Sequence, residues 1–305
     1  MRVLKWIAIC ACFLLGMALP QSVRAEAGPN GRTIYLPIVH LPPCPAIPGV
    51  TYEVIPVLEP STNPPASAHP DLNLALRGYR LAPGNPFKGF VFYGGEADAY
   101  APRLTDLFAD QRAPTFANLY QVYDWDGNWP GSFWPITSPE VTMAGLTATA
   151  GEILYLPGTF TPNEIYGGGY QALVLYAEEG RLTLKYTRED NVVWGYTIHL
   201  EGICVEPSLL ALYRASDVNG RAYLPGLKAR QPLGRARGSE VKIAVRDTGA
   251  FMDPRSHKDW WRDIPVSSNM IWRWAPEESW FQAHQRAILE RLRRRPQEGD
   301  FDGRR

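Results

Sequence analysis

The sequence predicts a mainly β protein: a single antiparallel β domain, sandwich-like or barrel-like, with a few short helices and a C-terminal helix. Three β-patterned runs follow one another at residues 173–177, 181–187 and 195–200. In the second run apolar and polar side chains alternate with a period of two, which is typical of a half-buried strand. Turn residues between the runs indicate short hairpins. A fourth run at 240–246 predicts a further strand of the same domain.

The N-terminus has the pattern of a secretory signal peptide over residues 1–25. Arg2 and Lys5 precede an apolar run at 6–19, and Ala25 ends a small-residue cleavage site. The run is roughly 14 residues, short of the about 20 that span a bilayer. We therefore expect cleavage after Ala25 and a secreted or extracytoplasmic protein, with retention as an uncleaved anchor as the alternative.

The remaining chain divides into three parts by composition. Residues 26–48 are rich in Pro and Gly and predict an extended arm, because proline excludes helices and central strands. Residues 49–257 form the predicted β domain. Residues 258–305 hold a Trp-rich segment, an amphipathic helix that ends before Pro296, and a disordered tail.

Two cysteines, Cys44 and Cys204, remain after removal of the signal. In an oxidising compartment such a pair predicts a disulfide, which contributes roughly 4–5 kcal/mol on the chain-entropy model. The alternative is a nucleophilic Cys204 with His199 as its base. Five residues separate them in one predicted strand, so their side chains are expected on opposite faces.

The charge of the chain argues against nucleic acid as a partner. Without Arg2, Lys5 and Arg24 the chain carries 28 basic and 31 acidic residues, whereas nucleic-acid binding calls for a strongly basic face. No segment after the signal is apolar enough to predict a membrane span.

Several shorter patterns predict local elements. Alternating leucines at 71–79 predict a strand, and residues 141–146 and 152–156 predict a hairpin around Gly151. Residues 104–110 predict a short helix, and 224–234 a loop.

The most aromatic stretch lies at 120–134 and supplies the predicted binding residues, which are Tyr123, Trp125, Trp129 and Trp134. Exposed aromatic rings beside Asp and Asn side chains suit stacking on sugar rings. The alternative is that these rings close the end of the β core. Residues 124–128 also place oxygen-bearing side chains at alternate positions, but the downstream Glu of a calcium loop is missing.

No metal or cofactor site is expected. The histidines occur singly, without His-x-His, His-Glu-x-x-His or Cys-x-x-Cys spacing. No nucleophile elbow is present, and the Gly-rich 167–169 turn lacks the Lys of a phosphate loop. His199 is the one weak catalytic candidate.

Two resemblances follow from the central motifs. The run from Arg181 to Val193, the run 195–200, and residues 247–256 with Asp259-Trp-Trp261 resemble a family of secreted bacterial proteins without an assigned function. More distantly, residues 141–254 are similar to the β-sheet domain of lysostaphin/LytM-type metallopeptidases. The matching motifs are Tyr196-Thr-Ile-His-Leu200, Lys228-Ala-Arg-Gln-Pro-Leu-Gly234 and 245–254.

The second resemblance implies a sheet domain whose zinc ligands are missing. The family's His-x-His corresponds to Glu240-Val-Lys242, and a lysine there would repel a metal ion. His69 and Asn73 alone have the spacing of the family's upstream ligands, and they lie far ahead of the sheet in the sequence. Only His199 would remain of that site, and fold does not imply function.

The leading hypothesis is a secreted, non-catalytic binding or structural module at the cell surface, with a cell-wall polymer, a polysaccharide or a surface protein as partner. The alternative is a secreted hydrolase of cell-wall peptide or glycan that uses His199 and an acid such as Asp190. A third hypothesis is that the Trp-rich segment at 260–280 binds a partner protein, against the alternative that it packs on the domain.

Overall fold

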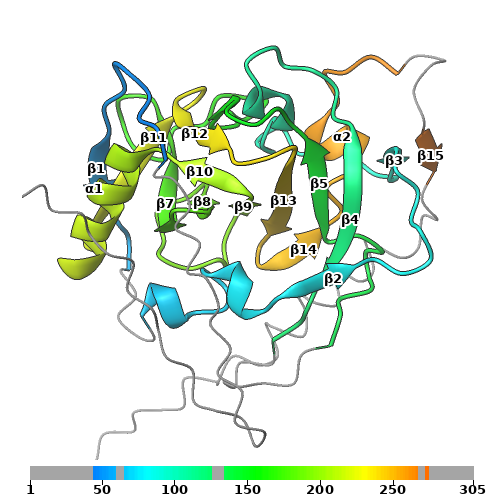
Figure 1. The fold of residues 1–305 in the computed structure, drawn as a ribbon, viewed down its shortest axis with the longest axis horizontal. Coiled ribbons are helices and arrows are strands. Elements are labelled where there is room, and N and C mark those ends of the chain that lie inside the picture. Colours follow the sequence, from blue (N-terminus) through cyan, green and yellow to red (C-terminus); the bar gives the residue numbers. More distant parts are fainter. Residues whose placement is uncertain (1–43, 60–64, 126–133, 267–271, 275–305) are drawn as a thin grey trace, which may run out of the picture. The chain divides into compact units, whose positions relative to one another are not determined.

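The structure is a computed structural model that describes residues 44–59, 65–125, 134–266 and 272–274. The predicted signal peptide, nearly all of the predicted arm, Trp129 and the C-terminal helix lie outside the described residues. Within the described residues the protein is mainly β, as the sequence predicts (Figure 1).

One large sheet dominates the fold and leaves its two edges open, so it is not a closed barrel. Its strand order is β1-β11-β7-β8-β9-β13-β5-β4-β2, and β14 pairs with β13. All of its pairings are antiparallel. The strands span β1 Glu53–Pro56, β2 Tyr79–Leu81, β4 Phe116–Val122, β5 Met143–Thr147, β7 Tyr170–Glu178, β8 Arg181–Lys185, β9 Tyr196–Glu201, β11 Tyr223–Lys228, β13 Glu240–Asp247 and β14 Ala250–Met252.

Smaller elements complete the described part of the chain. A three-stranded sheet contains β10 Ile203–Val205, β12 Pro232–Ala236 and β6 Ile153–Tyr155, and β15 Trp272–Trp274 pairs in parallel with β3 Phe90–Phe92. The helices are α1 Pro207–Val218 and α2 His257–Trp260, with 3-10 turns η1 Ala66–Ala68, η2 Leu74–Leu76 and η3 Leu104–Leu107. Glu206 caps α1 by accepting hydrogen bonds from the backbone N–H groups of Ser208 and Leu209.

The central strands are buried on both faces. One face of β8, β9 and β13 carries Leu, Ile and Val side chains that form the main apolar core. The opposite face carries polar side chains, yet β9 is buried along its whole length and β8 at all but its first residue. The expectation of a half-buried strand is therefore wrong, because further chain covers the polar face.

The sequence identified most strands but not all of their partners. The runs at 173–177, 181–187 and 195–200 form β7, β8 and β9, paired as successive hairpins. The predicted hairpin of 141–146 with 152–156 is wrong, because β5 pairs with β4 and β13 while β6 pairs with β12. Residues 224–234 contain parts of β11 and β12 instead of a loop.

The segment after His69 is not the predicted strand. It forms turns and η2, and the consecutive residues Leu72, Asn73 and Leu74 are all buried, which breaks the alternation of a strand. Its backbone groups bond locally, as in the hydrogen bond of 3.1 Å from the N–H of Arg77 to the carbonyl of Leu74. Gly78, with φ of 70°, then turns the chain into β2.

The predicted disulfide between Cys44 and Cys204 is present. It joins the start of the described chain to β10, at a sequence separation of 160 residues. This pairing rules out the alternative of a free Cys204 nucleophile.

Two tryptophans of the predicted Trp-rich segment lie inside the protein. Trp260 and Trp261 are both 0% exposed and belong to the main core. Their indole Nε1–H groups donate hydrogen bonds of 2.9 Å to the carbonyls of Asp253 and Pro254. This part of the Trp-rich segment packs on the β domain.

We expect Trp260→Ala to lower the free energy of unfolding by about 3–5 kcal/mol, because it removes a fully buried indole and leaves a cavity. Chemical denaturation measures the change. Trp274→Ala is the matched control, since Trp274 is 68% exposed and its loss should cost about 0.5 kcal/mol or less. Equal stability of both variants would contradict the buried position of Trp260.

Candidate functional site

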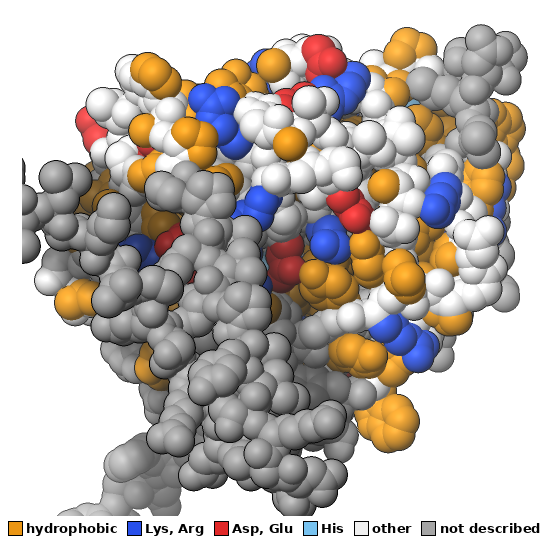
Figure 2. Space-filling view, in the orientation of Figure 1, with side chains coloured by type: hydrophobic (Ala, Val, Ile, Leu, Met, Phe, Trp, Pro, Cys, Tyr) orange, Lys and Arg blue, Asp and Glu red, His pale blue; other side chains and the backbone are white. Residues whose placement is uncertain are grey.

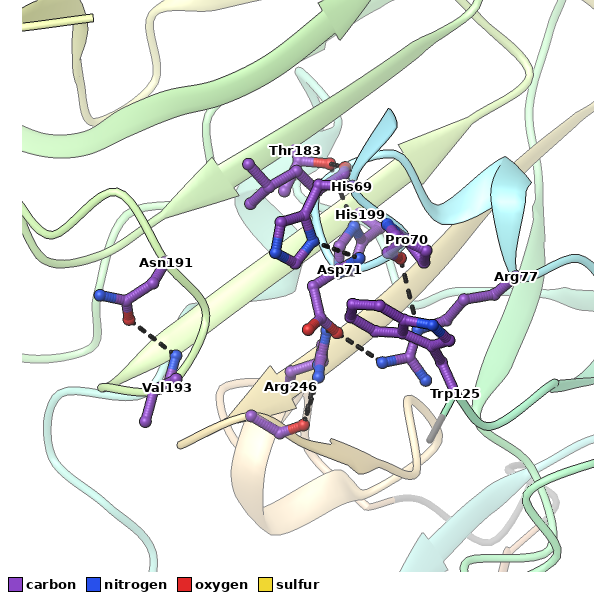
Figure 3. A network of polar contacts seen from close by, with 12 residues as sticks. His69, Pro70, Asp71, Arg77, Trp125, Thr183, Asn191, Val193, His199 and Arg246 are labelled. Carbon is purple, nitrogen blue, oxygen red and sulfur yellow. Dashed lines mark hydrogen bonds and ion pairs between the residues drawn. The ribbon is translucent and has the colours of Figure 1, made fainter. Parts of the chain in front are cut away.

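The polar face of the central sheet gathers the candidate site (Figure 3). Cross-strand pairing aligns Thr183 of β8 with His199 of β9, and Lys185 with Thr197. On the other side of β9, Arg246 of β13 lies opposite Thr197. Directly paired residues share one face of a sheet, so these side chains project to the same side.

The covering segment, residues 69–77, brings a second set of polar groups to this face. The Thr183 hydroxyl donates a hydrogen bond of 2.7 Å to the carbonyl of Leu72. Figure 3 shows His69, Asp71 and Arg77 of this segment grouped around His199 and Arg246. The segment therefore lies on the sheet, although more than a hundred residues separate it from β8 and β9 in the sequence.

His199 is held in one tautomer by Thr183. The single hydroxyl proton of Thr183 goes to Leu72, so the hydroxyl oxygen accepts the Nδ1–H of His199 at 3.0 Å. The neutral ring then carries a lone pair on Nε2, which has no hydrogen-bond partner. Burial, with the charges of Arg246 and Arg77, holds the pKa of His199 well below its ordinary value, so the ring is neutral.

Asp71 binds the two arginines that flank this histidine. Its Oδ1 accepts from Arg77 at 2.5 Å and from Arg246 at 2.7 Å. Burial by itself would raise the pKa of Asp71, but the two guanidinium charges outweigh it and hold the pKa far below the ordinary value. Asp71 is therefore ionised, and it ties the covering segment to β13.

Lys185 lies in the same face without such a partner. The side chain is 0% exposed, and its Nζ has no hydrogen-bond partner. Burial lowers its pKa to about 8, although the neighbouring carboxylate of Glu189 acts in the opposite direction. An ammonium group in this position costs stability whenever it is charged.

Lys185 Nζ, Thr197 Oγ1 and His199 Nε2 are among the buried polar side-chain atoms of this face that have no hydrogen-bond partner. Buried polar groups are nearly always satisfied by protein or by ordered water. The arrangement supplies donors from Lys185 and Thr197 and an acceptor from His199, so it suits water or a small polar group.

The predicted aromatic binding residues lie beside this face. The ring of Trp125 contacts His69 edge-on, with the centroids 5.4 Å apart, and lies 6.0 Å from the guanidinium of Arg77. Tyr123 forms an isolated β-bridge with Pro135, and the N–H of Asp124 donates to the carbonyl of Trp134 at 2.7 Å. The structure thus brings Tyr123, Trp125 and Trp134 to one edge of the sheet, and Trp129 lies outside the described residues.

These rings do not close the end of the core. Trp134 is 73% exposed, and Tyr123 and Trp125 are partly exposed. Tyr120 is the buried exception; its hydroxyl donates to Glu240 at 2.9 Å. For the calcium hypothesis only Asp124 can be placed, and one of its carboxylate oxygens accepts from the backbone N–H of Trp125.

The two positions that correspond to the family's His-x-His are engaged in other contacts. Glu240 accepts from Tyr120 and also from Asn118, at 3.1 Å. The ammonium of Lys242 lies 5.8 Å from the ring of Tyr79 and 5.6 Å from that of Tyr120. Within the described part of the chain, no three His, Cys, Asp or Glu side chains come together in a way that could hold a metal ion.

The upstream residues His69 and Asn73 also have local roles. His69 Nδ1 accepts the backbone N–H of Asp71 at 3.1 Å, and the amide of Asn73 donates to the carbonyl of Ser67 at 3.0 Å. The expected partner of His199 is engaged elsewhere, because both oxygens of Asp190 accept from Arg221, at 2.6 and 2.7 Å.

Sequence reasoning missed Asp71, Arg77, Lys185 and Arg246. Arg246 lies in the motif at 245–254 that carries the metallopeptidase resemblance, but that motif gave it no role at a site. The other three belong to no recognisable motif, and the charge of all four suggested solvent-facing positions. One signal was available in the sequence. Arg181, Thr183 and Lys185 alternate with apolar residues, which predicts a polar face of this strand but not which segment covers that face.

A scan against protein-family models finds no match for this chain, and a search of curated proteins finds none either. In the described residues no helix is long and apolar enough to cross a membrane. On the face shown in Figure 2, basic and acidic side chains lie interspersed among apolar ones.

We expect Lys185→Met to raise the free energy of unfolding at pH 7 by about 1–3 kcal/mol, because methionine keeps the aliphatic stem and removes an unpaired buried charge. The advantage should shrink as pH rises from about 8 to 10.5. In that range the folded wild type has lost the proton that the unfolded chain still binds, so the wild type gains stability.

Denaturation curves at several pH values measure this difference. Lys228→Met serves as the control because Lys228 is exposed, and it should change stability by about 0.5 kcal/mol either way. A strongly destabilised Lys185→Met protein would show that the ammonium has a partner after all.

Proposed function

We propose that this chain is secreted and acts as a non-catalytic binding module for a cell-wall polymer or polysaccharide at the cell surface. The observation that carries the proposal is the exposed aromatic edge formed by Tyr123, Trp125 and Trp134. Flat apolar rings next to polar side chains are the combination by which proteins recognise sugar rings.

The neighbourhood of these rings supports the proposal. Trp125 packs against His69 and Arg77, and Arg77 is itself held by Asp71 and by the carbonyl of Tyr123 at 3.3 Å. Side chains fixed in this way lose little entropy when a ligand binds. The rings therefore belong to a surface whose side chains are held in place before a ligand binds.

The non-catalytic part of the proposal draws on the chemistry of the sheet. If the distant likeness to lysostaphin/LytM-type peptidases is real, Glu240 and Lys242 stand at the family's ligand positions and bind Tyr120 and the aromatic rings instead. The secreted location draws on the N-terminal pattern and on the disulfide, which is typical of oxidising compartments.

Pull-down with insoluble cell-wall material and with polysaccharides tests the proposal. Trp134→Ala and Trp125→Ala should each weaken binding about tenfold, equivalent to ~1.4 kcal/mol, through loss of a stacking surface. Tyr223→Ala is the control: Tyr223 is 56% exposed and belongs to β11, next to the opposite edge of the sheet. If wild type and both Trp variants bind equally, the aromatic edge is not the binding surface.

The alternative is a hydrolase of cell-wall peptide or glycan, which one observation favours. His199 is neutral and its Nε2 lone pair has no hydrogen-bond partner, which is the form of the ring that can accept a proton, although its lowered pKa makes it a weak base. Release of soluble peptide or reducing sugar from cell walls, abolished by His199→Ala with the fold intact, would support it. Stoichiometric zinc in the purified protein would point the same way.

A further inference from the structure

A shallow hollow of about 520 Å³ lies at the surface, apart from the polar face of the sheet. It is lined by Asn85, Pro86, Phe87 and Lys88, which follow β2, and by Arg273 of β15. Its volume is in the range of small-ligand sites, and its lining combines an aromatic ring, an amide and two cations.

The charges around the hollow do not cancel. Arg273 forms an ion pair with Glu140, which also lies 3.3 Å from Arg255. Arg255 is paired in turn with Asp253 at 2.6 Å. Lys88 has no carboxylate within ion-pair distance among the residues that the structure describes, and its ammonium donates to the carbonyl of Ala117. Three cations thus share two carboxylates, and one positive charge is left over.

The walls of the hollow are fixed by contacts behind them. Arg255 donates to the carbonyl of Phe87 at 2.6 Å, and the guanidinium of Arg273 lies 5.3 Å from the centre of the Phe87 ring. Asn85, with φ of 51°, holds a left-handed turn that asparagine tolerates. These contacts prepare the site, so little ordering cost remains for a ligand.

We propose that this hollow is a subsite for the carboxylate of an acidic sugar residue, so that the polymer bound by the module is a carboxylated polysaccharide. This inference rests on the proposed function and names the class of its ligand. A single uncompensated positive charge matches a monoanionic carboxylate, and arginine and lysine supply charge-assisted donors for it. The ring of Phe87 and the amide of Asn85 offer an apolar face and a hydrogen-bonding group to the rest of the sugar.

The position of the hollow is compatible with one extended polymer that reaches both surfaces. Lys88 is bound to Ala117, near the start of β4, and Tyr123 and Trp125 follow the end of the same strand. Seven residues of extended chain from Ala117 to Asp124 span roughly 23 Å. A polysaccharide lying along this edge of the sheet would therefore meet the aromatic edge first and the cationic hollow several sugar units further on.

Affinity measurements with polygalacturonate and with its fully methyl-esterified form test the inference on the full chain, because esterification removes the carboxylate charge and keeps the polymer. We expect wild type to bind the acid form at least tenfold more tightly than the ester at low salt. The double variant Lys88→Ala/Arg273→Ala should lose at least tenfold for the acid form and less than twofold for the ester.

The matched control is Arg214→Ala/Lys228→Ala, which removes the same charge from exposed positions on α1 and β11. The inference is overturned if wild type binds both polymers equally, if it binds neither, or if the control pair loses as much affinity as the Lys88/Arg273 pair. The proposed function is judged separately, because Trp134→Ala should weaken binding to whole cell walls and to the ester as well.

Discussion

The single carboxylate of Asp71 determines how the polar face of the sheet is closed. It binds Arg77 from the covering segment and Arg246 from β13, so one partly buried anion joins two elements that are distant in the sequence. Each charge taken out of water costs several kcal/mol unless a partner compensates it. Removing Asp71 would leave two buried cations without that partner, which is why cover and sheet depend on each other.

The remaining contacts of the polar face follow from this closure. With Asp71 in place, the carbonyl of Leu72 meets the Thr183 hydroxyl, and that hydrogen bond in turn sets the tautomer of His199. Arg246 is further held by the carbonyl of Gly249, at 2.6 and 2.9 Å, which positions the turn into β14. The ring of Phe251 on β14 then lies nearly parallel to His199, with the centroids 6.3 Å apart.

Sequence patterns predicted the parts of the fold that depend on neighbours along the chain. β7, β8 and β9 have both the alternation and the turns of successive hairpins, and Cys44 and Cys204 are the two cysteines that lie outside the predicted signal peptide. The partners of β5 and β6 could not be predicted in this way, because they pair with β13 and β12, which lie about 80 to 100 residues further along the chain. The alternation of a strand predicts the strand itself and does not identify a partner that is distant in the sequence.

Only some members of the candidate site were predicted from the sequence, and their arrangement was not. His199 and Trp125 were chosen for separate hypotheses, one of catalysis and one of sugar binding, and the structure places both near the covering segment, His199 beneath it and Trp125 against His69. Asp71 and its two arginines link them. The two arginines are buried only because of tertiary packing, which the sequence pattern does not show. Charged residues are normally expected on the surface, so the sequence favoured the wrong environment for them.

The side chains of this region fall into two sets, one enclosed and one exposed to solvent. Thr197, His199 and Lys185 are enclosed, so a polymer cannot reach them without displacing the covering segment and its ion pairs. Trp134, Lys88 and Arg273 are exposed; Trp134 and Lys88 are hydrogen-bonded to the chain of β4 or just beyond it, and Arg273 lies on β15, which pairs with β3. Binding groups on loops held by a rigid sheet are the usual way in which a β scaffold presents a recognition surface. The buried charges thus serve to hold the cover and the sheet together, and the side chains along the edge are the ones to which we assign the proposed recognition.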